Sequence, residues 1–249
     1  MDNILLLGAG KIGAAIIELL CASGDYELAV ADRSQALLDA VGRDDIERVT
    51  ADLGDGAALR RLMAGRDAVI SALPYYLNTA IAEAARECGL HYFDLTEDVE
   101  TTRNVRRIAA DAETAFVPQC GLAPGFVSIV AHDVANRFEE LDTVRMRVGA
   151  LPRFPTNALN YNLTWSTDGL INEYCNPCEA IHEGRRVDVL ALQGSEEFSL
   201  DGVRYEAFNT SGGLGTLCDT LDGKVRELNY KTVRYPGHCN LMKMLVNDL

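Results

Sequence analysis

Three glycines near the N-terminus have the spacing of a phosphate-binding turn. Gly8, Gly10 and Gly13 form the pattern G-x-G-x-x-G, after a short apolar run and before a helical pattern. Such a turn needs Gly8 for its tight bend, Gly10 for close approach to a pyrophosphate, and Gly13 for close packing of helix on strand. The motif predicts a dinucleotide site that also includes Lys11 and Ile12. The alternative is a glycine-rich turn of an α/β protein without a dinucleotide.

An acidic residue follows this motif at the expected distance. Asp32 lies roughly 20 residues after Gly13, at the end of the second predicted strand. Its carboxylate can accept hydrogen bonds from the adenosine ribose hydroxyls and would repel a 2′-phosphate, which favours NAD. Arg33 beside it could stack on adenine or hold that phosphate, so NADP also remains possible.

Two further strand ends fall on the same predicted edge. Asp52 follows the third strand and could accept a hydrogen bond from the adenine amine, although capping a helix explains it equally well. Ser71, Ala72, Leu73 and Pro74 follow the fourth strand and would leave room for the nicotinamide ribose. The alternative there is a plain turn that places Pro74 in the first turn of the next helix.

Carboxylates after the fifth predicted strand are the candidates for proton transfer. A carboxylate at this edge would lie near the nicotinamide, where it could accept a proton or stabilise a positive charge during hydride transfer. Asp94 is the first candidate and Glu97 the second. Asp98 is better explained as a helix cap.

Polar groups in the second half could bind a carboxylate and transfer a proton. Arg234 could bind a carboxylate with two parallel hydrogen bonds, and His238 could act as an acid or base. A surface arginine and a packed histidine are the plainer alternatives. The turn at 209–213 could offer backbone amides to substrate, or serve only as a turn. Pro124 and Gly125 begin another helix and could present backbone N–H groups to the cofactor amide.

Composition excludes several classes of function. The chain has 249 residues, a formal net charge of −14 and a sequence pI near 4.7, which argues against nucleic acid and anionic membrane surfaces as partners. No apolar run is long enough for a membrane span, and no signal peptide is recognisable, so we expect a cytoplasmic protein. Cys175 and Cys178 have C-x-x-C spacing but no second pair, so no metal site is expected.

The pattern of elements changes once along the chain. Up to residue 142, short apolar runs alternate with helical patterns, which predicts an α/β domain with the doubly wound parallel sheet of the Rossmann fold. From residue 143 to 249, polar and apolar residues alternate and Asp201-Gly202 marks a hairpin turn. This second region is expected to be an α+β domain with a mostly antiparallel sheet.

Longer segments resemble a known family. They are residues 8–13, 73–76, 91–98, 121–125, 209–213, 224–226 and 234–238. Together they resemble the saccharopine dehydrogenase family, with the best agreement to the branch that contains lysine 6-dehydrogenase. The resemblance adds a set of substrate-binding candidates: Thr96, Asn209, Thr210, Gly212 and Arg234.

The resemblance implies an oxidoreductase that transfers hydride between a nicotinamide cofactor and the C–N bond of an amino acid of lysine or saccharopine type. It also implies a homodimer formed through the second domain. A carboxylated-polyamine dehydrogenase and a catalytically inactive NAD-binding sensor or scaffold module are the alternatives. Similar proteins continue with further helices, so we expect a shortened member or a fragment.

Overall fold

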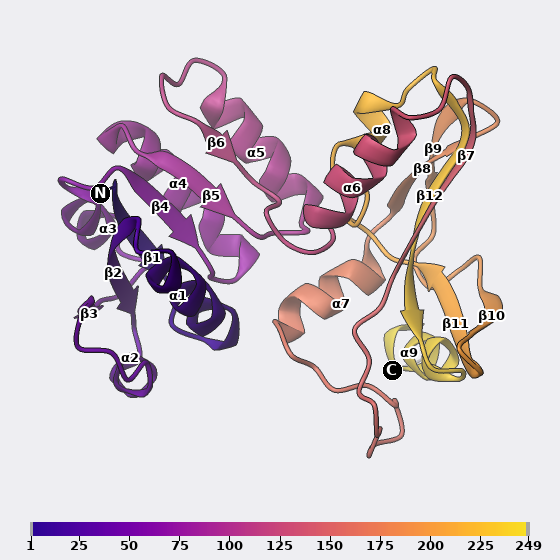
Figure 1. Cartoon of the computed structure of the whole chain (residues 1–249), viewed down its shortest axis with the longest axis horizontal. Helices are drawn as coiled ribbons and strands as arrows, with labels where there is room; N and C mark the ends of the chain where they lie inside the picture. The colour runs from indigo at the N-terminus through magenta and orange to yellow at the C-terminus, as the bar shows by residue number, and fades with distance from the viewer. Residues whose placement is uncertain (1, 248–249) are drawn as a thin grey trace. The chain divides into compact units, whose positions relative to one another are not determined.

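The computed structural model describes residues 2–247 and divides the chain into two compact units (Figure 1). The first unit ends at Cys120 and the second begins at Gly121. This division precedes the expected change at residue 142, because the intervening helix α6 (Phe126–Ala135) packs Val127 and Ala131 into the core of the second unit. No helix among residues 2–247 is long and apolar enough to cross a membrane.

The first unit is a parallel sheet with helices between its strands (Figure 1). Its strands are β1 (Asp2–Leu7), β2 (Tyr26–Asp32), β3 (Glu47–Thr50), β4 (Ala68–Ser71), β5 (His91–Asp94) and β6 (Phe116–Val117). Its helices are α1 (Lys11–Ser23), α2 (Gln35–Ala40), α3 (Gly56–Met63), α4 (Asn78–Cys88) and α5 (Val99–Ala109). The strand order β3-β2-β1-β4-β5-β6, parallel throughout, confirms the Rossmann prediction.

Both faces of this sheet are buried, which explains its continuous apolar strands. Leu5 and Leu7 of β1 pack in one core cluster with α3, α4 and α5. Ile4 and Leu6 of the same strand pack in a second cluster with α1 and α2. Because all strands run the same way, their carboxyl ends share one edge, and the loops after them carry the predicted cofactor residues.

The second unit is built on a mostly antiparallel sheet, as predicted. Its strands are β7 (Leu141–Val148), β8 (Cys178–His182), β9 (Arg185–Val189), β10 (Glu196–Leu200), β11 (Val203–Asn209) and β12 (Val225–Arg234). Its helices besides α6 are α7 (Thr167–Cys175), α8 (Leu217–Thr220) and α9 (His238–Asn247). The order is β10-β11-β12-β8-β9, and β7 pairs with β12 in parallel. The hairpin turn at Asp201-Gly202 joins β10 to β11 as expected.

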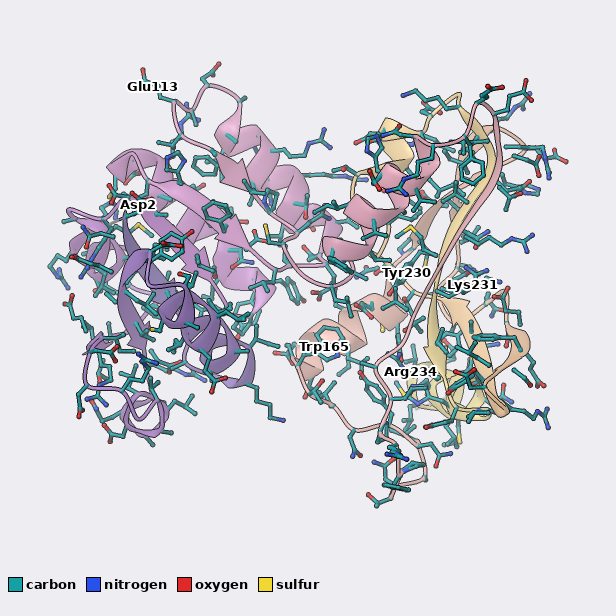
Figure 2. All side chains as sticks on the ribbon, viewed as in Figure 1. Asp2, Glu113, Trp165, Tyr230, Lys231 and Arg234 are labelled. Atoms are coloured by element: carbon teal, nitrogen blue, oxygen red, sulfur yellow. The ribbon has the colours of Figure 1, made fainter. Side chains whose placement is uncertain are left out.

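The side chains of β12 alternate between the two faces of this sheet, of which one is dry and the other polar (Figure 2). Tyr230 and Arg234 are buried on the side that faces α7. Lys231 points the other way, where its ammonium donates to Glu196 at 2.8 Å.

Candidate functional site

The glycine turn after β1 has the shape of a phosphate cradle. Gly8 has a φ of 102°, and a Cβ on Gly13 would lie 2.0 Å from the Gly8 carbonyl oxygen, so both positions require glycine. A Cβ on Gly10 would meet nothing within 4 Å. Lys11 and Ile12 then begin α1, whose N-terminus has no side-chain cap. Open space beside uncapped helix N–H groups fits a dinucleotide phosphate.

Asp32 ties this turn to the end of β2. Its side chain is buried; Oδ2 accepts from the Ala9 N–H at 2.8 Å and Oδ1 from the Ser34 N–H at 2.8 Å. Arg33 is exposed. The Asp32 carboxylate therefore stabilises the turn itself, besides placing a negative charge next to it.

The end of β4 is fixed by a buried side-chain pair. The Ser71 hydroxyl donates to the Asn78 side-chain oxygen at 2.7 Å, which joins β4 to α4. The Ala72 N–H continues the sheet, and the Leu73 side chain lies beside the glycine turn. Pro74 precedes a short 3-10 turn, with its ring half-buried. Ser71 is thus engaged within the protein, while the backbone after it stays at the sheet edge.

Two acidic residues near this edge have local structural partners. Asp52 is exposed and accepts from the Gly54 N–H at 3.0 Å, within its own turn. Asp98 caps α5, accepting from the Thr101 N–H at 2.7 Å. The capping role expected for Asp98 is confirmed.

Asp94 is a fully buried carboxylate whose two oxygens both accept hydrogen bonds. Oδ2 accepts from the Tyr92 hydroxyl at 2.7 Å, and Oδ1 accepts from the N–H groups of Thr96 at 2.9 Å and Gln119 at 3.1 Å. Gln119 has a φ of 65°, an uncommon conformation for a non-glycine residue. Burial raises the pKa of Asp94, while these hydrogen bonds oppose the rise. The arrangement holds the loops after β5 and β6 together.

Glu97 is a buried carboxyl group with one oxygen that lacks such partners. Its side chain is 9% exposed, and among residues 2–247 no group forms a hydrogen bond with its Oε1 atom. Burial raises its pKa to about 7, and the nearby carboxylates of Asp98 and Asp94 add to the rise. A carboxyl group that titrates near neutrality and has one oxygen without a partner can accept or release a proton.

A buried cation dominates the dry face of the second unit. Arg234 is 4% exposed, and its guanidinium lies 4.3 Å from the centre of the Tyr161 ring. Its Nε donates to the Tyr174 hydroxyl at 3.2 Å and Nη1 to the Val233 carbonyl at 2.9 Å. Within residues 2–247 it forms no ion pair with a carboxylate. Because a buried charge normally has a partner of opposite sign, this one fits an anionic ligand group.

His238 lies beside this cation. It is 1% exposed; Nδ1 is 2.9 Å from the Leu159 carbonyl oxygen and Nε2 is 3.1 Å from the Tyr174 hydroxyl. Burial lowers its pKa, as does the nearby Arg234 charge. His238 is therefore neutral at pH 7 and hydrogen-bonded at both nitrogens.

The turn after β11 contains one unpaired hydroxyl. Thr210 is 2% exposed, and its Oγ1 has no hydrogen-bond partner within the described chain. Asn209 donates its side-chain N–H to the Leu190 carbonyl at 3.2 Å. Gly212 has a φ of 79°, so the turn requires glycine there. Thr210 is the residue of this turn with capacity left for a ligand.

Comparison with known proteins decides the family. The model of the saccharopine dehydrogenase NADP binding domain matches residues 4–117, and that of the saccharopine dehydrogenase C-terminal domain matches residues 121–247. The chain belongs to the saccharopine dehydrogenase family. Its first unit is therefore the family's NAD(P)-binding domain, which agrees with the glycine cradle described above.

Individual relatives agree with this placement. Mitochondrial alpha-aminoadipic semialdehyde synthase of Mus musculus is 26% identical over 195 residues, covering 75% of this chain and 21% of the mouse protein. Saccharopine dehydrogenase [NADP(+), L-glutamate-forming] of Saccharomyces cerevisiae is 25% identical over 190 residues, covering 74% of this chain and 43% of the yeast protein. The chain thus spans less than half the length of these relatives.

A solved structure shares the fold. The apo, histidine-tagged saccharopine dehydrogenase (L-Glu forming) from Saccharomyces cerevisiae superposes with a TM-score of 0.78 at 23% identity, covering 99% of this chain and 58% of that one. The two family models confirm the saccharopine dehydrogenase resemblance. The finer expectation of the lysine 6-dehydrogenase branch is not supported, since these relatives carry saccharopine dehydrogenase and semialdehyde synthase names.

The remaining predicted residues belong to the second unit. Pro124 and Gly125 belong to the second unit and open α6. The N–H groups of Phe126 and Val127 donate to carbonyls of the same turn, at 2.9 and 3.0 Å, so they are not free to bind a cofactor amide. The C-x-x-C pair connects α7 to β8, with Cys175 exposed and Cys178 buried.

Sequence reasoning did not identify the tyrosines that contact the candidate residues of each unit. Tyr92 binds Asp94, and Tyr161 and Tyr174 surround Arg234. Tyrosine is common in cores, and nothing in its spacing separates a core tyrosine from one that orients a charge. Only the fold brings these rings to their partners.

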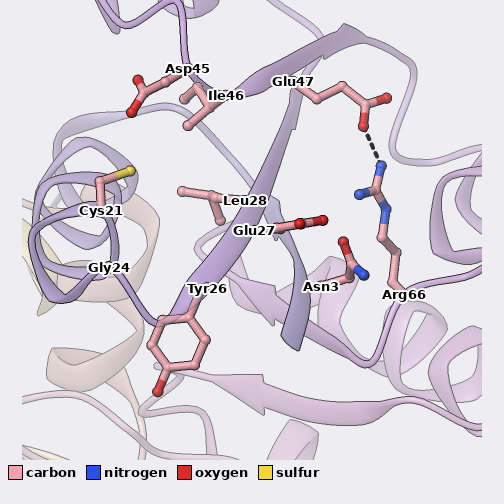
Figure 3. Close-up of a pocket in the computed structure, with 10 residues that line it drawn as sticks. All are labelled: Asn3, Cys21, Gly24, Tyr26, Glu27, Leu28, Asp45, Ile46, Glu47 and Arg66. Atoms are coloured by element: carbon pink, nitrogen blue, oxygen red, sulfur yellow. Dashed lines mark hydrogen bonds and ion pairs between the residues drawn. The ribbon is translucent and has the colours of Figure 1, made fainter. Parts of the chain in front are cut away.

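The first unit also has an open pocket of about 520 Å³ (Figure 3). It lies at the amino-terminal ends of β1, β2 and β3, bordered by Asn3, Tyr26 and Glu47. Arg66 and Glu47, which both line the pocket, form an ion pair at one side of it. Because the glycine cradle lies at the carboxyl ends of the same strands, this pocket is separate from the NAD(P) site.

Proposed function

We propose that the protein is a nicotinamide-dependent oxidoreductase that acts on the C–N bond of an amino-acid substrate of saccharopine type. The observation that carries this proposal is the buried Arg234 guanidinium, which has no carboxylate partner within residues 2–247 and suits the carboxylate of an amino acid. Family membership supports the chemistry.

The first unit would hold the dinucleotide. Gly8, Gly10 and the N-terminus of α1 would bind its phosphates, and the loops after β4 and β5 would border the nicotinamide. When bound, the nicotinamide accepts or returns the hydride. We propose NAD as the preferred form, because the buried Asp32 carboxylate would repel a 2′-phosphate.

Glu97 is the proposed acid–base group. With a pKa near 7 and an unpaired Oε1, it can take a proton from a substrate amine and release it later. Asp94 would instead fix the loops that position Glu97, since both of its oxygens are already engaged. This order reverses the ranking suggested by sequence alone.

A substrate survey tests the proposal. Oxidation of saccharopine, lysine and a carboxylated polyamine would be followed as NADH or NADPH formation at 340 nm. We expect turnover with saccharopine and NAD, and a loss of at least about 100-fold in Glu97→Gln. Binding of NADH without oxidation of any of the three would contradict the enzyme proposal and favour a sensor module. Turnover of the polyamine alone would favour the polyamine class.

A further inference from the structure

The structure assigns Tyr174 as a positioning residue that, together with His238, orients Arg234 to bind one carboxylate. The inference deepens the proposed function by naming the group that the second unit recognises. It stands on a continuous chain of hydrogen bonds that runs from a backbone carbonyl to the guanidinium.

The direction of each hydrogen bond in this series follows from the Leu159 carbonyl at its start. The Leu159 carbonyl can only accept, so Nδ1 of His238 carries the hydrogen at their 2.9 Å contact. Neutral His238 then has a bare Nε2, which accepts from the Tyr174 hydroxyl at 3.1 Å. That leaves the oxygen of Tyr174 with its lone pairs toward Arg234, where it accepts from Nε at 3.2 Å. Every donor in the chain therefore has one acceptor.

Packing fixes the same groups. The Tyr161 ring lies 4.3 Å under the guanidinium, and the Tyr174 and Phe208 rings meet edge to face at 5.9 Å. The His238 ring stacks on Phe208 at 6.2 Å. The plane of the Arg234 guanidinium is thus held on one face and along one edge before any ligand binds.

The remaining edge of Arg234 is the one that a carboxylate would use. Nε and one N–H of Nη1 are engaged, whereas no partner within residues 2–247 binds Nη2. The two terminal nitrogens of a guanidinium match the two oxygens of a carboxylate. Because the arginine is already oriented, less side-chain freedom is lost on binding than for a flexible arginine.

Calorimetric titration of the full chain tests this inference without turnover. The probes are glutarate and its neutral diamide, which share a carbon skeleton and differ in charge. Wild type should prefer glutarate. Tyr174→Phe keeps the ring and removes the hydroxyl, so we expect about 10-fold weaker glutarate binding, with diamide and NADH binding unchanged. Tyr205→Phe is the matched control, because the Tyr205 ring stacks on Tyr235 and contacts Phe198, while its hydroxyl forms no hydrogen bond within residues 2–247.

A double-mutant cycle separates positioning from general loss of structure. Arg234→Gln should abolish the preference for glutarate, and adding Tyr174→Phe to it should cause no further change in glutarate binding. If Tyr174→Phe folds poorly, His238→Gln provides a second way to interrupt the series of hydrogen bonds that ends at Arg234. Wild-type glutarate affinity in both Tyr174→Phe and His238→Gln overturns the inference, as does equal binding of glutarate and diamide by wild type. Because no turnover is measured, absence of enzyme activity would refute the proposed function alone.

Discussion

Asp94 and Glu97 are two buried carboxylates that differ in their hydrogen-bond partners and therefore in their chemical properties. Asp94 receives hydrogen bonds from one hydroxyl and two backbone N–H groups, whereas Glu97 has an oxygen with none among residues 2–247. The first is held in place by its partners. The second can exchange a proton, since burial has brought its pKa to about 7.

Glu97→Gln should remove an ionisation from the pH profile. As a base, Glu97 must be charged, so amine oxidation by wild type should rise with pH through a midpoint near 7. In Glu97→Gln we expect turnover about 100-fold lower and no step at that pH. Steady-state rates between pH 5 and 9 would measure both. A step that persists in Glu97→Gln would assign the ionisation to another group.

The same pKa has a consequence for stability. The folded state holds the Glu97 proton more tightly than the unfolded state, where the pKa is near 4.5. The stabilisation of the folded state by protonated Glu97 is therefore fully present below pH 4.5 and is lost as the pH rises through 7. Between these limits the free energy of unfolding should fall less steeply in Glu97→Gln than in wild type.

Asp94→Ala should destabilise the protein more than Asp98→Ala. Removing Asp94 leaves the Thr96 and Gln119 N–H groups without their acceptor, and leaves the buried Tyr92 hydroxyl only the Asn78 carbonyl at 3.4 Å, so we expect a loss of about 3 kcal/mol in the free energy of unfolding. Removing the α5 cap at Asp98 should cost about 1 kcal/mol. Urea denaturation of both variants provides the comparison. Equal losses would mean that Asp94 is not the main tie between these loops.

For individual residues, the sequence predicted the position of a candidate in the fold better than its chemical role. The residues after parallel strands were located because such strands end at one edge of their sheet. Their partners were not, because the Tyr92 hydroxyl and the Gln119 N–H reach Asp94 only through the register of β5 and β6. Asp94 therefore ranked above Glu97 by sequence, whereas their hydrogen bonds favour the reverse order.

Among elements, regular strands were easier to predict than short or exposed ones. The expected parallel strands and the alternating strands β7, β9, β11 and β12 are present. Strands β8 and β10 were not anticipated. The run of β8, Cys178–His182, is brief and follows a C-x-x-C pair, and β10 carries adjacent charges in Glu196–Leu200. Pairing with a neighbouring strand stabilises them despite a weak local pattern.

The turn between β1 and α1 depends on a neighbouring strand through Asp32. Asp32→Asn exchanges one acceptor oxygen for a donor, so either the Ala9 or the Ser34 N–H loses its partner. We expect a loss of about 1–3 kcal/mol in the free energy of unfolding and a smaller preference for NAD over NADP. Asp39→Asn, at an exposed position of α2, is the matched control. Fluorescence titration with NADH and NADPH would detect an unchanged preference, which would contradict the proposed role of Asp32 in cofactor choice.

At the scale of the whole molecule, lowering the pH should reduce the stability of the folded state, because buried His238 must then take up a proton. Its folded pKa lies below the unfolded value of 6.5, so its contribution is complete above pH 6.5 and is lost as the pH falls below it. The charges facing it are Arg234, which opposes protonation, and Glu206, which favours it. His238→Gln should therefore show a shallower loss of thermal stability between pH 6.5 and 5 than wild type. His182→Gln should not, because the exposed His182 pairs with Glu227 and its pKa is raised.

Gly10 and Gly13 belong to the same turn, but we expect random substitution at the two positions to have different effects. At position 13, a library selected only for accumulation of intact protein should return glycine alone, since any Cβ would collide with the Gly8 carbonyl oxygen. At position 10, where an added Cβ meets nothing within 4 Å, small residues should pass that selection. The same position 10 clones should then be lost on an immobilised adenine-nucleotide column. Folding would thus restrict one glycine and the ligand the other.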